Sequence, residues 1–285
     1  MTQRERMHAA YRGERPDRLP WLVNMDHWYN VNKAQGTLAE RYRDWPLWEI
    51  QRDLRVSIWQ RCGVVRSTSA AEGVTRREES REGGMRYLIE TPLGTLTEEY
   101  TIAPDFTRAR FRTKWLVASP QELRAAAASE CPFLQVGGNI TAAVVSPRLF
   151  ARYAMPFFRQ VTDLLHAGGK HAQYHFDGWV RPLLPMIAES GLDCIEALTP
   201  QPSGDVTLAE AIAALQGKVL IQGGMPAALV THGFDQEECG RYALETIRIA
   251  KTGRVALGMG DNVPPDGDLE RVRLITRLVE EQGWL

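Results

Sequence analysis

Apolar runs of strand length alternate with helical patterns through the second half of the chain. The strand-like runs fall at residues 133–136, 170–176, 192–198, 218–222 and 254–258. Between them apolar residues recur at the helical spacing, as in the helix after Ser146, which presents Phe150, Phe157 and Leu165 on one face. Strands that alternate with helices run parallel and are joined by right-handed crossovers. The pattern predicts an α/β fold, with a TIM (β/α)8-type barrel as the best fit and a doubly wound sheet as the alternative.

The first half of the chain has fewer helices and one alternating segment. Residues 74–100 alternate polar and apolar positions, with turns at Gly83-Gly84 and at 92–94, which is typical of an antiparallel meander. We therefore expect one barrel domain over residues 1–285 with a small antiparallel β insertion at about 74–100. The other elements expected here are helices at 4–11, at 47–59 and from Ser119 to before Pro132, strands at 21–25 and 63–65, and a loop at 26–30.

Capping residues mark where several helices begin. Ser146 is followed by Pro147, which suits the first turn of a helix. Two pairs match the capping box, in which a cap residue and a glutamate three positions later satisfy each other's backbone. These pairs are Thr207 with Glu210 and Asp235 with Glu238.

The composition and charge exclude several classes of protein. Of the 285 residues, 44% are hydrophobic and 24% are charged, and the net charge is −1. This charge gives no case for nucleic acid or an anionic membrane as a partner. No apolar run is long enough to cross a bilayer, and the first residues lack the apolar segment of a signal peptide. The four cysteines form no CxxC pair, so we expect a cytoplasmic protein with free thiols.

Ionisable residues stand where the predicted strands end. His175 and Asp177 are two positions apart at the end of one strand, so they face the same side. Glu196 and Asp261 stand at the ends of two other strands, and the carboxyl ends of parallel strands share one rim, where ligands bind. Such groups can perform acid–base catalysis, with His175, Asp177 and Glu196 as the catalytic set. The same three residues with Asp261 could instead hold a divalent metal through nitrogen and oxygen ligands. In the structural alternative, the two aspartates cap loops and His175 is a core histidine.

Polar residues near the same strand ends are candidates for substrate binding. Loops at one end of such a sheet commonly carry function, although these residues can equally serve turn chemistry. The candidates are Asn24, Asp26, His27, Asn139 and Asn262.

Several stretches of the sequence resemble the uroporphyrinogen decarboxylase superfamily, and in particular its methyltransferase-like branch. They are "RMHAAYRGERPDRLP" at 6–20, "TPLGTL" at 91–96, the long stretch from "SPRLF" to "HFDG" at 146–178, "EALTPQPSGDVTLAEA" and "GMGDNVPPDG". The superfamily contains the decarboxylase of haem synthesis and methyltransferases linked to corrinoids and folates. The resemblance implies a TIM barrel with its site at the carboxyl ends of the strands.

Three features depart from the family pattern. The decarboxylase branch carries an arginine-rich motif after the first strand, where this chain has the acidic and aromatic residues 24–29. Thiol-alkylating relatives hold zinc with His-x-Cys and a later Cys, where this chain has His175-Phe176-Asp177 and Asp261, without thiolates. Relatives also have more chain between the "TPLGTL" and "SPRLF" motifs, so we expect βα units to be shortened or missing in the middle, with the barrel left incomplete or closed in a homo-oligomer.

The resemblance implies methyl transfer from a small methylated substrate such as a methoxy or methylamine compound. Corrinoid or tetrahydrofolate would accept the methyl group, and a corrinoid protein would be a partner. His175, Asp177 and Glu196 would hold a divalent metal or activate the leaving group.

Two alternatives stay open. The first is decarboxylation of a tetrapyrrole or another polycarboxylate, with Asp26 steadying a cationic intermediate. The missing arginine motif counts against it. The second is a non-catalytic barrel that acts as a binding module and would form obligate oligomers.

Overall fold

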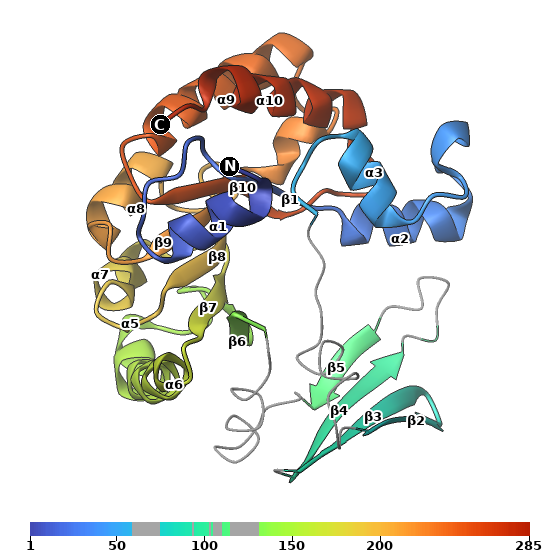
Figure 1. Ribbon diagram of the computed structural model, residues 1–285, viewed down its shortest axis with the longest axis vertical. Coiled ribbons are helices and arrows are strands. Elements are labelled where there is room, and N and C mark those ends of the chain that lie inside the picture. Colours follow the sequence, from blue (N-terminus) through green and yellow to red (C-terminus); the bar gives the residue numbers. More distant parts are fainter. Residues whose placement is uncertain (59–74, 93, 103, 105–109, 115–130) are drawn as a thin grey trace. The chain divides into compact units, whose positions relative to one another are not determined.

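The computed structural model describes residues 1–58, 75–92, 94–102, 104, 110–114 and 131–285 (Figure 1). The strand expected at 63–65 and the helix expected from Ser119 lie outside these ranges. The chain divides into two compact units. One unit comprises Met1–Gln60, Gly138–Arg159 and Gln173–Leu285, and the other comprises Arg61–Gly137 and Gln160–Ala172.

The larger sheet is parallel and contains the strands expected from the sequence. Its six strands lie in the order β1-β10-β9-β8-β7-β6. The pairings from β1 through β10, β9 and β8 to β7 all run parallel, which confirms an α/β fold. Within the described ranges the sheet does not close into an eight-stranded barrel. The strands are β1 (Trp21–Asn24), β6 (Phe133–Ile140), β7 (His171–Phe176), β8 (Cys194–Leu198), β9 (Leu220–Met225) and β10 (Val255–Asn262).

Helices follow the strands of this sheet in the chain, and α9 packs against β9, β10 and α10 (Figure 1). Both capping boxes are confirmed, because Thr207 accepts a bond from the Glu210 amide and Asp235 from the Glu238 amide. Ser146 caps the helix before β7 as expected. The α-helices are α1 (Gln3–Tyr11), α2 (Asp26–Gln35), α3 (Leu47–Asp53), α5 (Pro147–Leu149), α6 (Met155–Ala167), α7 (Leu184–Ile187), α8 (Leu208–Leu215), α9 (Gln236–Ala250) and α10 (Leu269–Gln282). A π-helical segment, Phe150–Ala154, joins α5 to α6, and short 3-10 segments lie at Glu40–Tyr42, Arg181–Leu183 and Ala227–Val230. No helix in the described part of the chain combines the length and the apolarity needed to span a bilayer.

The antiparallel insertion expected at about 74–100 is confirmed. Its four strands lie in the order β2-β3-β4-β5 and pair antiparallel throughout. The edge strand β2 is almost wholly exposed and rich in arginine and glutamate, which discourages pairing with another chain. The fourth strand was not expected from the sequence. The strands are β2 (Thr75–Arg81), β3 (Gly84–Thr91), β4 (Gly94–Ile102) and β5 (Arg110–Lys114).

The segment after β1 is a helix, so the prediction of a loop at 26–30 is wrong. The structure has helix α2 there, with Asp26 in its first turn and Gly36 ending it in the left-handed region at φ 68°. Trp28, Tyr29 and Asn32 form the buried side of the helix. Tertiary burial of these side chains holds the segment in a helix although its local propensity is weak.

Helix α1 is tied to the last strand of the sheet. Arg254 directly precedes β10. Its Nε donates to the carbonyl of Ala10 at 2.9 Å, and its Nη2 donates to the carbonyl of Tyr11 at 2.6 Å. These carbonyls lie at the end of α1, where the helix itself supplies no further N–H donors. The carbonyl of Ala10 also accepts the backbone N–H of Gly13 at 3.2 Å. The guanidinium therefore joins the first helix to strand β10, which also pairs with β1.

An aromatic cluster packs the start of α6 against β7. The ring of Phe158 has its centroid 5.8 Å from that of Phe150, 4.8 Å from that of Tyr174 and 6.0 Å from that of Phe176. Phe158 itself is fully buried. This cluster packs against β7, the strand that carries His175.

Candidate active site

The centre of the candidate site is a contact between β7 and β8. His175 and Glu196 are register partners on these parallel strands, so their side chains leave the sheet at the same level. The Nδ1 atom of His175 lies 2.5 Å from Oε2 of Glu196. The side chains are only 13% and 4% exposed, so water screens their attraction weakly. The pair is a charge-assisted hydrogen bond when the imidazole is protonated.

The surroundings of His175 favour its protonated form. Burial lowers the pKa of His175. The hydrogen bond with Glu196 and the charges of Glu196, Asp261 and Asp177 raise it. The net result is a pKa above its usual value of 6.5. The three carboxylates expected at the strand ends therefore all act on His175 in the structure. In the described residues, Nε2 of His175 makes no hydrogen bond and is the ring nitrogen that can meet a ligand.

A bulge at the end of β8 adds a residue that the sequence analysis missed. The pairing of β8 with β9 shifts between Ile195 and Leu198, and Ala197 has a left-handed φ of 68°. The shift brings the hydroxyl of Thr199 to Asp177, to which it donates at 2.9 Å.

Glycines leave room for Thr199. A Cβ on Gly260 would lie 2.3 Å from Oγ1 of Thr199, and one on Gly204 would lie 2.0 Å from its carbonyl oxygen. Gly223, at φ 133°, approaches the backbone of Leu198 in the same way. Glycines at such positions are the sequence signal from which a crowded strand end could have been predicted.

The three asparagine candidates lie on other strands of the same sheet, namely β6, β10 and β1. The Oδ1 atom of Asn139 accepts the backbone N–H of Asp177 at 3.2 Å. Asn262 donates to the side chain of Asp261 at 2.8 Å, and its register partner across the sheet is Asn24. These three candidates thus lie at strand ends of the same sheet.

The two remaining substrate-binding candidates lie on helix α2. Asp26 is half-buried, and its backbone N–H donates to the side chain of Asn24 at 3.2 Å. His27 is exposed. A role for either in substrate binding stays a prediction.

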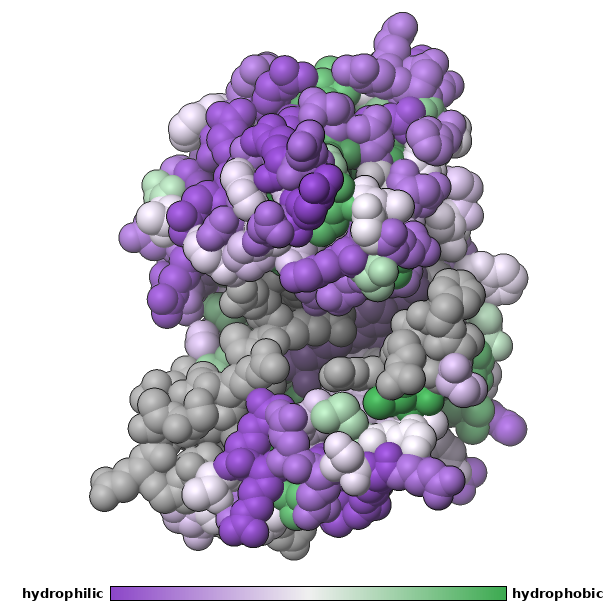
Figure 2. Space-filling view, turned by 90° about the vertical axis from the view of Figure 1, so that its right-hand side faces the viewer, coloured by the Kyte–Doolittle hydropathy of each residue, from purple (hydrophilic) through white to green (hydrophobic). Residues whose placement is uncertain are grey.

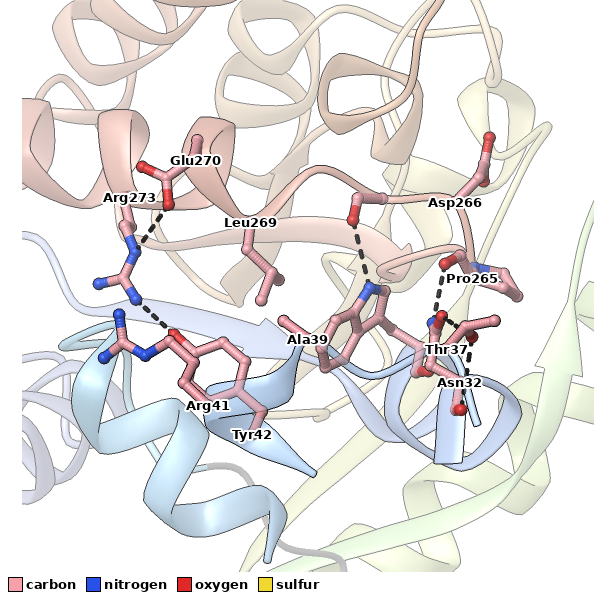
Figure 3. A pocket seen from close by; sticks show the side chains of 12 residues that line it. Asn32, Thr37, Ala39, Arg41, Tyr42, Pro265, Asp266, Leu269, Glu270 and Arg273 are labelled. Atoms are coloured by element: carbon pink, nitrogen blue, oxygen red, sulfur yellow. Dashed lines mark hydrogen bonds and ion pairs between the residues drawn. The ribbon is translucent and has the colours of Figure 1, made fainter. Parts of the chain in front are cut away.

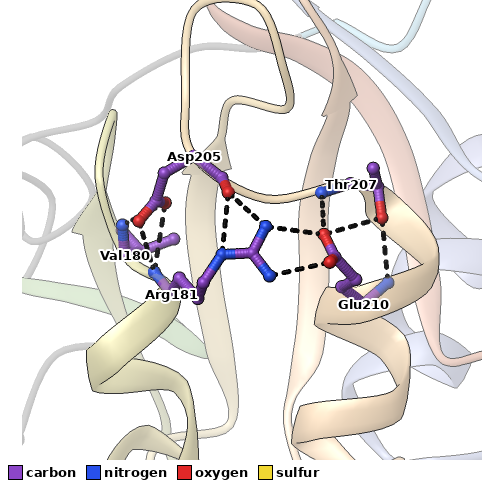
Figure 4. Close-up of polar contacts among 5 residues, drawn as sticks. All are labelled: Val180, Arg181, Asp205, Thr207 and Glu210. Carbon is purple, nitrogen blue, oxygen red and sulfur yellow. Dashed lines mark hydrogen bonds and ion pairs between the residues drawn. The ribbon is translucent and has the colours of Figure 1, made fainter.

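A network of charged groups fixes the loop after β7 (Figure 4). The carboxylate of Asp205 accepts the backbone N–H groups of Val180 and Arg181 at 2.8 and 3.1 Å. The guanidinium of Arg181 then bridges the carbonyl of Asp205 and the carboxylate of Glu210, with 2.7 Å between its Nη1 and Oε1 of Glu210. The loops after β7 and β8 are thereby held together at the rim where Asp177 and Thr199 meet.

The buried groups below the rim are structural. The Tyr11 hydroxyl donates to Gln173, and burial raises the pKa of the Cys194 thiol to about 12. A thiol with that pKa is not a nucleophile at neutral pH.

A separate pocket of about 340 Å³ opens between α2, the segment after it and α10, and none of the expected site residues lines it (Figure 3). Its walls include Trp28 and the guanidinium groups of Arg41 and Arg273. Both guanidiniums bond to Asp53, the first at 2.6 Å, and the second also contacts Glu270 at 3.2 Å. Because these charges neutralise one another, the pocket offers few unpaired charges to an ionic ligand.

The donor geometry does not reproduce the expected metal centre. Among the residues that the structure describes, no three His, Cys, Asp or Glu side chains are grouped to hold one metal ion. Nδ1 of His175 is bonded to Glu196, and Asp177 accepts from Thr199. The arrangement suits acid–base chemistry, and a metal held by His175, Asp177, Glu196 and Asp261 stays a prediction.

The fold and the rim define a parallel α/β protein whose ionisable groups gather at the carboxyl ends of its strands. The family model described as uroporphyrinogen decarboxylase (URO-D) matches residues 113–282, more than half of the chain. The chain therefore belongs to the uroporphyrinogen decarboxylase family. The resemblance seen in the sequence motifs is confirmed.

A solved structure and a search of curated proteins complete the comparison. A methyltransferase from Methanosarcina mazei superposes with a TM-score of 0.61, covers 99% of each chain and has 12% sequence identity. At this identity the likeness shows a shared fold. The search of curated proteins finds no match.

Proposed function

We propose that the protein is a methyltransferase that moves a methyl group from a small methylated substrate to a corrinoid or tetrahydrofolate acceptor. The observation that carries the proposal is the His175–Glu196 pair at the rim, 2.5 Å apart and nearly buried. Membership of the family and the fold shared with a methyltransferase support it. A corrinoid acceptor would arrive on a partner protein.

The pair suits the chemistry of methyl transfer. An oxygen or nitrogen that loses a methyl group to a nucleophile leaves most readily as a neutral, protonated group. An imidazolium whose charge is maintained by Glu196 can supply or keep that proton at Nε2. Asp177, held by the hydroxyl of Thr199, would orient the substrate beside it. A bound corrinoid would supply the nucleophile that takes the methyl group.

The test is transfer from a panel of methoxy and methylamine donors to reduced corrinoid or tetrahydrofolate. Methylcorrinoid is read by absorbance and methyltetrahydrofolate by mass spectrometry. With methoxy donors, whose leaving oxygen needs a proton, His175→Gln should lower the rate about 10²- to 10⁴-fold, the usual contribution of a general acid. The matched control is His232→Gln at an exposed histidine, which should not change the rate.

Decarboxylation is the second outcome of the same test. The charged groups acting on His175 are carboxylates, which disfavour a polycarboxylate substrate. Turnover of uroporphyrinogen that is lost in Asp26→Asn, with no methyl transfer from the panel, would replace our proposal. Absence of both activities in an obligate oligomer would point to a binding module.

A further inference from the structure

Gln222 is a polar residue of β9 that the proposed chemistry does not use. Ile221 pairs with Ile195 of β8, and the bulge then sets Glu196 and Ala197 against Gln222. Side chains at matching positions on parallel strands face the same side. Gln222 therefore faces the side of the sheet on which Glu196 reaches His175.

The side chain of Gln222 is buried without a partner. It is 6% exposed, and in the structure as described its Oε1 atom accepts no hydrogen bond. Its register partner on the other side, Ala256, has no polar side-chain atom to offer. Glu196 is already bonded to His175. A buried amide oxygen is costly to leave unbonded, so such an atom in a ligand site calls for a donor on the ligand.

The charge around the site determines which kind of hydrogen-bond donor a ligand should carry. Glu196, Asp177 and Asp261 contribute three carboxylates against one imidazole, and the charges acting on that imidazole come from these carboxylates. Even with His175 protonated, the cluster carries a net negative charge. It would repel an anionic ligand and attract a cation.

We propose that the site takes a protonated methylated amine whose N–H donates to Oε1 of Gln222 and whose charge is balanced by Glu196, Asp177 and Asp261. The proposal rests on the proposed function and names its substrate class. A protonated amine is also a consistent methyl donor. When its C–N bond breaks, the electron pair stays on nitrogen and a neutral amine leaves. The methyl group passes to the electron pair of the reduced corrinoid, or to an amine nitrogen of tetrahydrofolate, which then releases its own proton to water.

The experiment is calorimetric titration of the whole protein at neutral pH, without an acceptor. The probes are trimethylammonium, which has one N–H, tetramethylammonium, which has none, and 4-methoxybenzoate, which is anionic. Trimethylammonium should bind most tightly and the benzoate most weakly. In Gln222→Leu the Kd for trimethylammonium should rise about tenfold, the usual effect of losing a hydrogen bond to a charged group, while that for tetramethylammonium stays nearly constant.

Two control variants test whether the effect is specific to the hydrogen-bond acceptor at position 222. Gln222→Glu keeps an acceptor and should retain binding of trimethylammonium, whereas Gln282→Leu, at an exposed glutamine, should change nothing. Thermal unfolding without ligand tests whether Gln222→Leu folds. Because it removes an unbonded buried amide, it should not lower the Tm.

Either of two results would overturn the proposal: equal losses for both ammonium probes in Gln222→Leu, or tighter binding of the benzoate than of either cation. The proposed function fails separately. Amine binding without methyl transfer would refute the methyltransferase alone, and transfer from methoxy donors without amine binding would refute this substrate class alone.

Discussion

Replacing Glu196 by glutamine tests whether the carboxylate holds a charged imidazole. The substitution keeps the shape of the side chain and removes its charge. Because the contact is 2.5 Å long and nearly buried, it belongs to the strong class of hydrogen bonds to charged groups, worth about 1.5–3 kcal/mol. We expect Glu196→Gln to lower the free energy of unfolding by this amount where His175 is protonated.

The effect should depend on pH with a definite sign. The pKa of His175 is raised in the folded protein, so its stabilisation is fully present below the unfolded pKa of about 6.5 and disappears as the pH rises through the folded value. The difference between wild type and Glu196→Gln should therefore be largest near pH 6 and shrink toward pH 9. Urea unfolding at a series of pH values measures it, and an NMR titration of the His175 ring should show a lower pKa in the variant.

The matched control is Glu189→Gln, which breaks an exposed pair with Lys218. Exposed pairs contribute about 0–1 kcal/mol, so its effect should be small at every pH. If Glu196→Gln costs no more than Glu189→Gln, or costs the same at pH 6 and pH 9, the reasoning about this pair is wrong.

Three further predictions concern the rim and the core. The hydrogen bonds of Glu210 with Arg181 and with Thr207 at the helix cap lower the pKa of Glu210 to about 2. The stabilisation that the Glu210 carboxylate contributes is therefore present above the unfolded pKa of 4.5 and is lost as the pH falls toward 2. The stability of Glu210→Gln, measured by unfolding at a series of acidic pH values, should depend less on pH between 4.5 and 2 than that of the wild type. Thr199→Val should lower the transfer rate about tenfold because Asp177 loses its donor, and Thr199→Ser should restore it; equal rates in both variants would remove Thr199 from the site. Phe158→Ala should cost about 3–5 kcal/mol in chemical unfolding, since the ring is fully buried in the aromatic cluster, and a cost below 1 kcal/mol would contradict that packing.

The parts of the fold that the sequence predicted are those determined by local pattern. Capping boxes such as Thr207 with Glu210 act within one helical turn, and the meander at 75–102 follows from alternation between glycine turns. The sequence also predicted that ionisable residues such as His175 and Glu196 lie near one another, because the carboxyl ends of parallel strands meet at the same edge of the sheet.

The parts that could not be predicted depend on tertiary contacts. Helix α2 forms because Trp28 and Tyr29 are buried, which no local propensity reveals. Thr199 reaches Asp177 only through the left-handed Ala197, and Gln222 joins the site only through the register of β9. A bulge or a register is a relation between two strands, so one strand's sequence does not specify it.

The pairing of β1 with β10 has a consequence for the synthesis of the chain. Trp21 and Leu257 are register partners, and Arg254 caps the carbonyls that end α1. During translation β1 is made before the other described strands of its sheet, and its partner β10 is made after them. Until then the apolar residues 21–23 have no completed sheet to enter. The pairing of β1 with β10 is therefore a late event that closes a long loop, and contacts of such high sequence separation slow folding and lengthen the exposure of apolar strands.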